Sequence, residues 1–271
     1  MADRTEPGNA ADSPLNKPPA RSLPTLTAGR WARRLRPGSG PGIRLFCFPY
    51  AGGGASMFRD WPVRLPPSVD PYAVQLPGRE GRLAEPAYDR MAPLVDALAD
   101  GLAPLLAGPE PYAFAGISMG AKVALELTRV LRDRGRPLPR LLGVASCTAP
   151  SLNAPLPWTE PDEKIVDYMR SMGATPAEVL IDEDLLDLLV PTMRADLTLL
   201  SVHEYPADDP VDVPIHAFAG LDDPESSPER MRPWAVETRA GFRLDALPGD
   251  HLLSPEGERR MLDLIAADLT T

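Results

Sequence analysis

The sequence is poor in histidine and cysteine, with three residues of the first kind and two of the second. Two isolated cysteines cannot build the disulfide framework of a small secreted domain, so we expect Cys47 and Cys147 to be buried thiols in a reducing compartment. The sequence has no H-E-x-x-H pattern and no cluster of cysteine and histidine. We therefore expect no metal site.

Long apolar runs are also missing. No segment reaches the roughly 18 consecutive apolar residues of a membrane-spanning helix, and the first residues lack the apolar core of a signal peptide. Positive charge is scarce too, because the formal net charge is −10. These features predict a cytoplasmic protein, expected to be a monomer, with neither a membrane nor a nucleic acid as its partner.

Proline is abundant, with 34 residues beside 21 glycines. Seven of these prolines fall in residues 1–41, a stretch that shows no apolar periodicity and is rich in arginine. Such composition favours a solvated linker over a packed element. We therefore predict a disordered, Pro-rich basic tail over residues 1–41 and a single domain over residues 42–271, which is long enough to bury a large core.

Within the predicted domain, short apolar runs alternate with helical patterns, which is typical of βα units and a mostly parallel sheet. The predicted strands are Ile43–Phe48, Tyr72–Leu76, Tyr112–Ile117, Leu141–Cys147, Pro214–Ala219 and Phe242–Leu247. The predicted helices between them are Ser56–Leu65, Arg90–Leu106, Met119–Arg134, Glu229–Thr238 and Pro255–Leu269. Residues 150–212 break the alternation with helical patterns alone, which predicts a helical lid inserted in an α/β fold.

The segment Gly116-Ile117-Ser118-Met119-Gly120 fits the G-x-S-x-G pattern of a nucleophile elbow. It follows a predicted strand and precedes a predicted helix, as that motif requires. The helix N-terminus would also place backbone N–H groups beside a developing negative charge. These observations identify Ser118 as the candidate nucleophile, with an ordinary tight turn as the alternative.

A serine nucleophile needs a base, and the three histidines can be compared directly. His216 lies within a predicted strand and His203 ends the inserted helices, so packing roles are favoured for both. His251 follows the last strand, and we predict that it is the base. A carboxylate at the end of the preceding strand should orient this histidine, and Asp222 and Asp223 are both candidates. Either one gives the α/β-hydrolase order of serine, acid and histidine.

The glycine-rich segment 49–54 follows the first strand and lacks the G-K-[ST] ending of a phosphate-binding loop. A flexible turn is one interpretation of it. The interpretation we favour is half of an oxyanion hole, in which the Ala51 N–H acts together with the Met119 N–H. Met169, Met172 and Met193 in the inserted helices could line an adaptable acyl pocket, although core packing is the commoner role of methionine.

Several of these motifs, taken in order, resemble type II thioesterases of polyketide and nonribosomal-peptide biosynthesis. The motifs are Phe48-Pro49-Tyr50-Ala51-Gly52-Gly53-Gly54, Gln75-Leu76-Pro77-Gly78-Arg79-Glu80, the serine elbow, Pro191-Thr192-Met193-Arg194-Ala195-Asp196, Gly220-Leu221-Asp222-Asp223-Pro224 and Gly249-Asp250-His251. The resemblance implies an α/β-hydrolase with a helical lid. It also selects Asp223 as the acid, because in the family the acid directly precedes the proline.

The resemblance further implies hydrolysis of acyl groups from phosphopantetheinyl carrier proteins, for editing or for release, with those carriers as partners. No cofactor is expected beyond the phosphopantetheine arm on the substrate. The chain departs from the family where Ile117 replaces the usual histidine of the elbow. This change makes the region beside Ser118 apolar and leaves the expected triad of Ser118, Asp223 and His251 complete.

Three other functions are compatible with these residues. An acyltransferase could use the same serine and histidine, although the glutamine-rich loop of malonyl-type acyltransferases is absent. A small-molecule carboxylesterase could use the whole triad, because a triad does not distinguish oxygen esters from thioesters. A catalytically silent hydrolase fold could act only by binding carriers.

Overall fold

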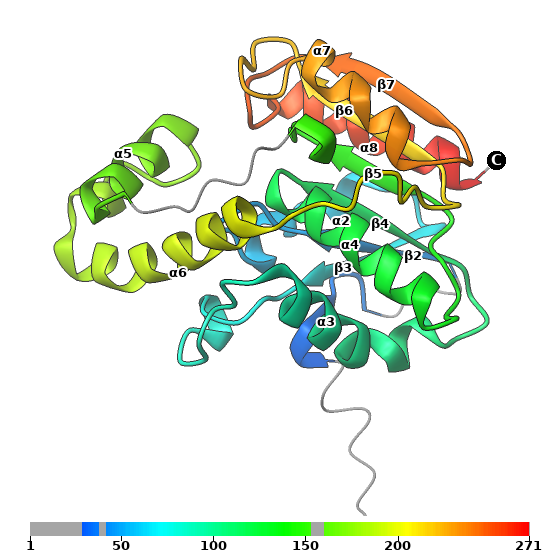
Figure 1. The fold of residues 1–271 in the computed structure, drawn as a ribbon, viewed down its shortest axis with the longest axis horizontal. Helices are drawn as coiled ribbons and strands as arrows, with labels where there is room; N and C mark the ends of the chain where they lie inside the picture. Colours follow the sequence, from blue (N-terminus) through cyan, green and yellow to red (C-terminus); the bar gives the residue numbers. More distant parts are fainter. Residues whose placement is uncertain (1–28, 38–41, 153–159, 271) are drawn as a thin grey trace, which may run out of the picture.

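The computed structural model describes residues 29–37, 42–152 and 160–270, and it contains a seven-stranded sheet with helices on both faces (Figure 1). In chain order the strands are β1 (Ala32–Arg34), β2 (Ile43–Phe48), β3 (Val69–Val74), β4 (Tyr112–Ile117), β5 (Leu142–Ala145), β6 (Ile215–Gly220) and β7 (Phe242–Leu247). Their order in the sheet is β1-β3-β2-β4-β5-β6-β7. All pairs are parallel except β1 with β3, so the predicted α/β class is confirmed.

The helices cover the two faces of the sheet with separate apolar clusters. The α-helices are α2 (Trp61–Arg64), α3 (Met91–Leu106), α4 (Met119–Asp133), α5 (Asp162–Met172), α6 (Glu183–Val202), α7 (Pro228–Met231) and α8 (Pro255–Thr270). Short 3₁₀ helices are η1 (Ala55–Phe58), η2 (Glu80–Arg82), η3 (Pro150–Leu152), η4 (Val179–Ile181) and η5 (Arg232–Glu237). Residues of α3 and α4 belong to one cluster, and residues of α2 and α8 belong to the other.

Two predicted helices are wrong as continuous elements. The segment Ser56–Leu65 is divided between η1 and α2, and Glu229–Thr238 is divided between α7 and η5. Pro62 and Pro233 each occupy the second position of the later piece. Because proline has no N–H with which to continue a preceding helix, it favours the start of a new one.

The predicted disordered tail is wrong for residues 29–37. Residues 32–34 form β1, and the Arg34 Nε donates to Asp70 Oδ2 over 2.6 Å. Trp31 is buried against α3, where a Cβ on Gly101 would lie 2.1 Å from the indole ring. A three-residue strand with two arginines has too little apolar character to be recognised from its pattern. Residues 1–28 and 38–41 of the predicted tail lie outside the described residues.

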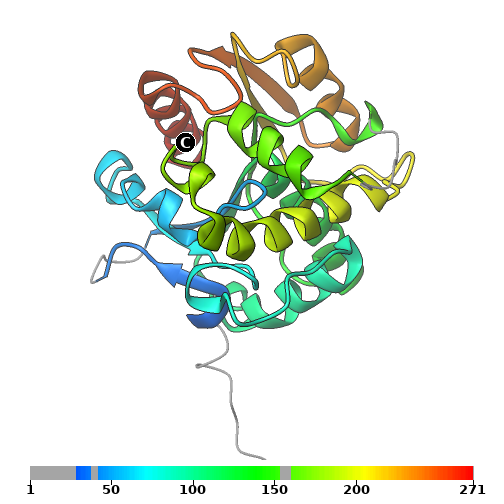
Figure 2. The same ribbon diagram turned by 90° about the vertical axis from the view of Figure 1, so that its left-hand side faces the viewer.

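The long connection between β5 and β6 contains η3, α5, η4 and α6, and its residues 153–159 lie outside the described part. In Figure 2, which faces these elements, α5 and α6 lie in front of the sheet. We refer to α5, η4 and α6 as the inserted helices. No helix in the described ranges is long and apolar enough to span a membrane.

His216 packs within the sheet, between the last strand and the last helix. Its Nδ1 lies 2.6 Å from Asp268 Oδ2, and its Nε2 lies 2.6 Å from Asp245 Oδ2. We expect His216→Leu to lower the free energy of unfolding by about 2 kcal/mol, because it removes the buried partner of two carboxylates that are partly exposed and still paired with Arg243. Urea unfolding measures this effect, and a loss below about 0.5 kcal/mol would contradict it.

Candidate active site

The sharp turn at Ser118 is possible because the first and last residues of the elbow are both glycines. Ser118 follows β4 and caps α4 with φ of 53° and ψ of −117°, which is a strained conformation for a residue with a side chain. A Cβ on Gly116 would lie 2.3 Å from the Gly120 carbonyl oxygen. A Cβ on Gly120 would lie 2.2 Å from the Phe48 carbonyl oxygen, so the elbow packs directly on the end of β2.

The structure brings together the serine, histidine and aspartate that the sequence singles out. The Ser118 Oγ lies 3.0 Å from His251 Nε2, and the His251 Nδ1 lies 3.0 Å from Asp223 Oδ2. Asp222, the alternative acid, has an exposed side chain, and its N–H donates to the Gly249 carbonyl. The geometry therefore places Asp223, and not Asp222, against the histidine.

The Asp223 carboxylate is buried, and other groups besides the histidine support it. Burial alone would raise the pKa of Asp223, but hydrogen bonds from His251, the Ser226 hydroxyl and the Glu225 N–H hold that pKa well below its usual range. Sequence reasoning missed Ser226. Its position three residues after the acid in one loop is a weak signal, because serine is common in turns.

The other two histidines lie elsewhere. His203 follows α6, with its Nε2 3.2 Å from Glu126 Oε2 and its ring edge-on to Tyr205. His216 is the sheet residue already described. Of the three histidines, His251 is the one that lies within hydrogen-bonding distance of Ser118, and its role as the base stays a prediction.

Ala51 and Met119 are the predicted oxyanion donors: Met119 directly follows Ser118 in the chain, and Ala51 lines the same cavity as Ser118. Met119 is the first residue of α4, so its N–H has no partner within the helix. Ala51 is the second residue of a turn that the Gly53 N–H closes onto the Tyr50 carbonyl over 2.9 Å. Gly52 has φ of +76°, as the third position of a type II turn requires, and the hydrogen bond that closes this turn does not use the Ala51 N–H.

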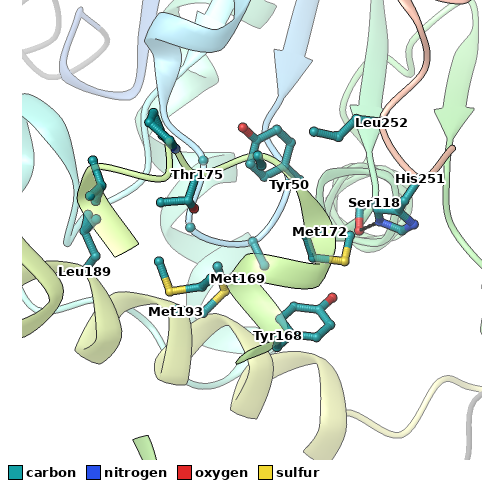
Figure 3. A pocket seen from close by; sticks show the side chains of 16 residues that line it. Tyr50, Ser118, Tyr168, Met169, Met172, Thr175, Leu189, Met193, His251 and Leu252 are labelled. Atoms are coloured by element: carbon teal, nitrogen blue, oxygen red, sulfur yellow. Dashed lines mark hydrogen bonds between the residues drawn. The ribbon is translucent and has the colours of Figure 1, made fainter. Parts of the chain in front are cut away.

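An apolar cavity of about 200 Å³ opens at Ser118. Figure 3 shows Ser118 and His251 at one end of it and Leu189 toward the other. Its walls come from the turn after β2, from the inserted helices and from the loop after β7, and they include Tyr50, Tyr168, Met169, Met172, Val179, Leu189, Met193 and Leu252. The three methionines considered from the sequence all line this cavity. Flexible thioether side chains can adapt to apolar groups of different shape.

Metal-binding clusters and exposed thiols are not found among the described residues. No group of three or more histidine, cysteine, aspartate or glutamate side chains there is arranged to hold a metal ion. Cys47 and Cys147 are both free and buried, and burial raises the pKa of each thiol. Of the possible nucleophiles discussed, only Ser118 has a histidine within hydrogen-bonding distance.

Comparison with known proteins gives the family. Residues 43–269 match the thioesterase domain family. The gramicidin S biosynthesis protein GrsT of Aneurinibacillus migulanus is 34% identical over 89% of this chain and 94% of its own length. The thioesterase RedJ of the prodiginine pathway in Streptomyces coelicolor is 36% identical, with a TM-score of 0.78 over 86% of this chain and 97% of its own.

A second solved structure is the type II thioesterase BorB from the borrelidin biosynthetic cluster. It is 34% identical, with a TM-score of 0.76 over 88% of this chain and 97% of its own. The order of the motifs, the fold and these relatives agree. The chain therefore belongs to the thioesterase domain family, with the α/β-hydrolase fold, and within that family to the type II thioesterases of polyketide and nonribosomal-peptide pathways.

Proposed function

We propose that this thioesterase hydrolyses acyl groups from phosphopantetheinyl carrier proteins with Ser118, His251 and Asp223 as its catalytic triad. The observation that carries the proposal is the chain of two 3.0 Å hydrogen bonds that ends at Ser118 Oγ, at the mouth of an apolar cavity. The hydroxyl, the base and a buried carboxylate stand in the order that nucleophilic catalysis requires.

In the proposed reaction, His251 Nε2 takes the Ser118 proton while the Oγ attacks the thioester carbonyl. The Ala51 and Met119 N–H groups donate to the resulting oxyanion. The C–S bond then breaks, and the phosphopantetheine sulfur leaves as a thiol with the proton from His251. Water, deprotonated by the same histidine, attacks the acyl-serine and releases the free acid and Ser118.

The cavity supports an apolar acyl group as the substrate. The acyl chain would extend from Ser118 toward Leu189, along walls that the inserted helices supply. These helices would act as the lid, because they form much of the cavity wall and their displacement would widen it. The methionine lining favours tolerance of several chains over selection of one, as an editing role requires.

The partners in this proposal are acyl or peptidyl carrier proteins of an assembly line. The names of the relatives place them in such pathways, and the reaction needs only water and a thioester. The phosphopantetheine arm belongs to the substrate, so the enzyme requires no cofactor of its own. We further propose that the enzyme acts as a cytoplasmic monomer.

The proposal is tested by measuring free-acid release from a panel of acyl-phosphopantetheinyl carriers beside p-nitrophenyl esters of the same acids. We expect larger kcat/KM values for the carriers, with activity across several chain lengths. Hydrolysis of the free esters alone would instead establish a carboxylesterase. Transfer of the acyl group to an added thiol or alcohol in preference to water would establish an acyltransferase. No turnover of either substrate would leave a catalytically silent, carrier-binding protein as the remaining alternative.

A further inference from the structure

A buried ion pair joins the inserted helices to the turn that carries Ala51. Asp196 lies on α6, and its carboxylate accepts from both terminal nitrogens of Arg79 over 2.7 and 2.8 Å. The two side chains are 3% and 4% exposed. The same carboxylate accepts the Gly52 N–H over 2.7 Å, so a residue 144 positions away holds the peptide that follows Ala51.

Arg79 contacts the other side of the same turn. Its Nη1 also donates to the Gly53 carbonyl over 3.3 Å, and its Nε donates to the Pro77 carbonyl over 3.1 Å. The planar guanidinium therefore spans the carboxylate, the turn and its own loop, which a single ammonium group could not do. Together with the internal Gly53 to Tyr50 hydrogen bond, these contacts fix the peptides around Ala51 from both sides.

The charges of this pair also bear on the oxyanion. A lone carboxylate one residue from an oxyanion donor would oppose negative charge on the substrate oxygen, and the adjacent guanidinium offsets that effect. A pair needed only for stability could be replaced by packed apolar groups at little cost. The contact with the Gly52 N–H gives this pair a second role that apolar groups could not perform.

We propose that Arg79 and Asp196 are positioning residues that hold the Ala51 N–H where the oxyanion forms. The inference rests on the proposed function, because it assumes that Ala51 serves as an oxyanion donor. Neither side chain is required to touch the substrate. The pair acts on the transition state through the turn, so its loss should lower kcat and leave KM nearly unchanged.

The test variant is Asp196→Asn, assayed on a p-nitrophenyl ester so that the result does not depend on the choice of carrier. We expect kcat to fall about 10- to 100-fold, less than the complete loss of a donor, with KM within about twofold. Affinity for a trifluoromethyl ketone that mimics the oxyanion should fall by the same factor as kcat. Affinity for the free-acid product should not change.

The matched control is Glu237→Gln, which removes a charge from the buried Arg129–Glu237 pair on another part of the fold. It should lower the urea midpoint and leave kcat unchanged. A loss of stability in Asp196→Asn without a loss of kcat would overturn the proposal, and so would a rise in KM alone. If Asp196→Asn fails to fold, Arg79→Lys is the second test variant. It keeps the positive charge but loses the two-pronged hydrogen bonding of the guanidinium, and the same criteria apply to it.

The assays distinguish a failure of the positioning role from a failure of the proposed function. Wild-type activity on carriers or on esters tests the proposed function. The ratio of variant to wild-type kcat tests the positioning role, whichever ester the enzyme prefers. An inert wild-type protein, with no affinity for the ketone, would overturn both.

Discussion

Ser118→Ala should lower kcat for acyl-carrier hydrolysis by on the order of 10⁵-fold, because no acyl-serine can form without the hydroxyl. The residual rate would come from the oxyanion donors and from binding, which the substitution leaves in place. The measurement is release of free acid under saturating acyl carrier, together with mass spectrometry of the protein after rapid quenching. Wild-type protein should carry the acyl group on Ser118, and the variant should carry none.

A second serine provides a matched control. Ser146 follows β5 as Ser118 follows β4, and it also has a positive φ, of 52°. Its buried hydroxyl makes no hydrogen bond within the described residues. Ser146→Ala should therefore keep kcat within about threefold of wild type. Retention of most activity by Ser118→Ala would show that the nucleophile lies elsewhere.

Asp223→Asn should lower kcat by about 10⁴-fold, because an amide in place of the carboxylate favours the wrong histidine tautomer and cannot stabilise the imidazolium. Single-turnover acylation of Ser118 should slow by the same factor. Asp222→Asn is the control, since that neighbouring side chain is exposed. If the two substitutions had equal effects, Asp223 would not be the orienting acid.

Asp223→Asn should also change how the free energy of unfolding depends on pH. The pKa of Asp223 is held below its usual value of about 3.9, so the ionised carboxylate stabilises the fold above about pH 4. This stabilisation declines below pH 4 and is lost as the pH falls through the lowered pKa. Urea midpoints measured from pH 7 to pH 3 should fall more steeply for wild type than for Asp223→Asn.

The parts of the fold that follow local rules could be predicted from the sequence. The strands Ile43–Phe48, Tyr112–Ile117 and Phe242–Leu247 have the predicted bounds, because each is a compact apolar or alternating run. The strand predicted at Tyr72–Leu76 begins three residues earlier, with Pro71 inside it. That proline faces the end of β1, where its missing N–H costs at most one hydrogen bond of the sheet.

The parts that depend on contacts between distant segments could not be predicted. Ser118 and His251 were identifiable because the elbow has a strict local pattern and histidine is scarce. The residues alone left Asp222 and Asp223 equivalent, since only the folded loop decides which carboxylate turns inward. Arg79 and Asp196 belong to recognisable motifs, but their pairing across 117 positions has no local signal.

The arginine-bearing strand β1 has a consequence for how copies of the chain meet. An edge strand presents unpaired backbone groups, and a long apolar edge invites another chain to add to the sheet. Here β3 is covered by the three residues of β1, which run antiparallel to it; two of them are arginines, and Arg34 is paired with Asp70. A second copy approaching that edge would find only a short template for strand addition, so we expect β1 to disfavour pairing of two copies through this edge.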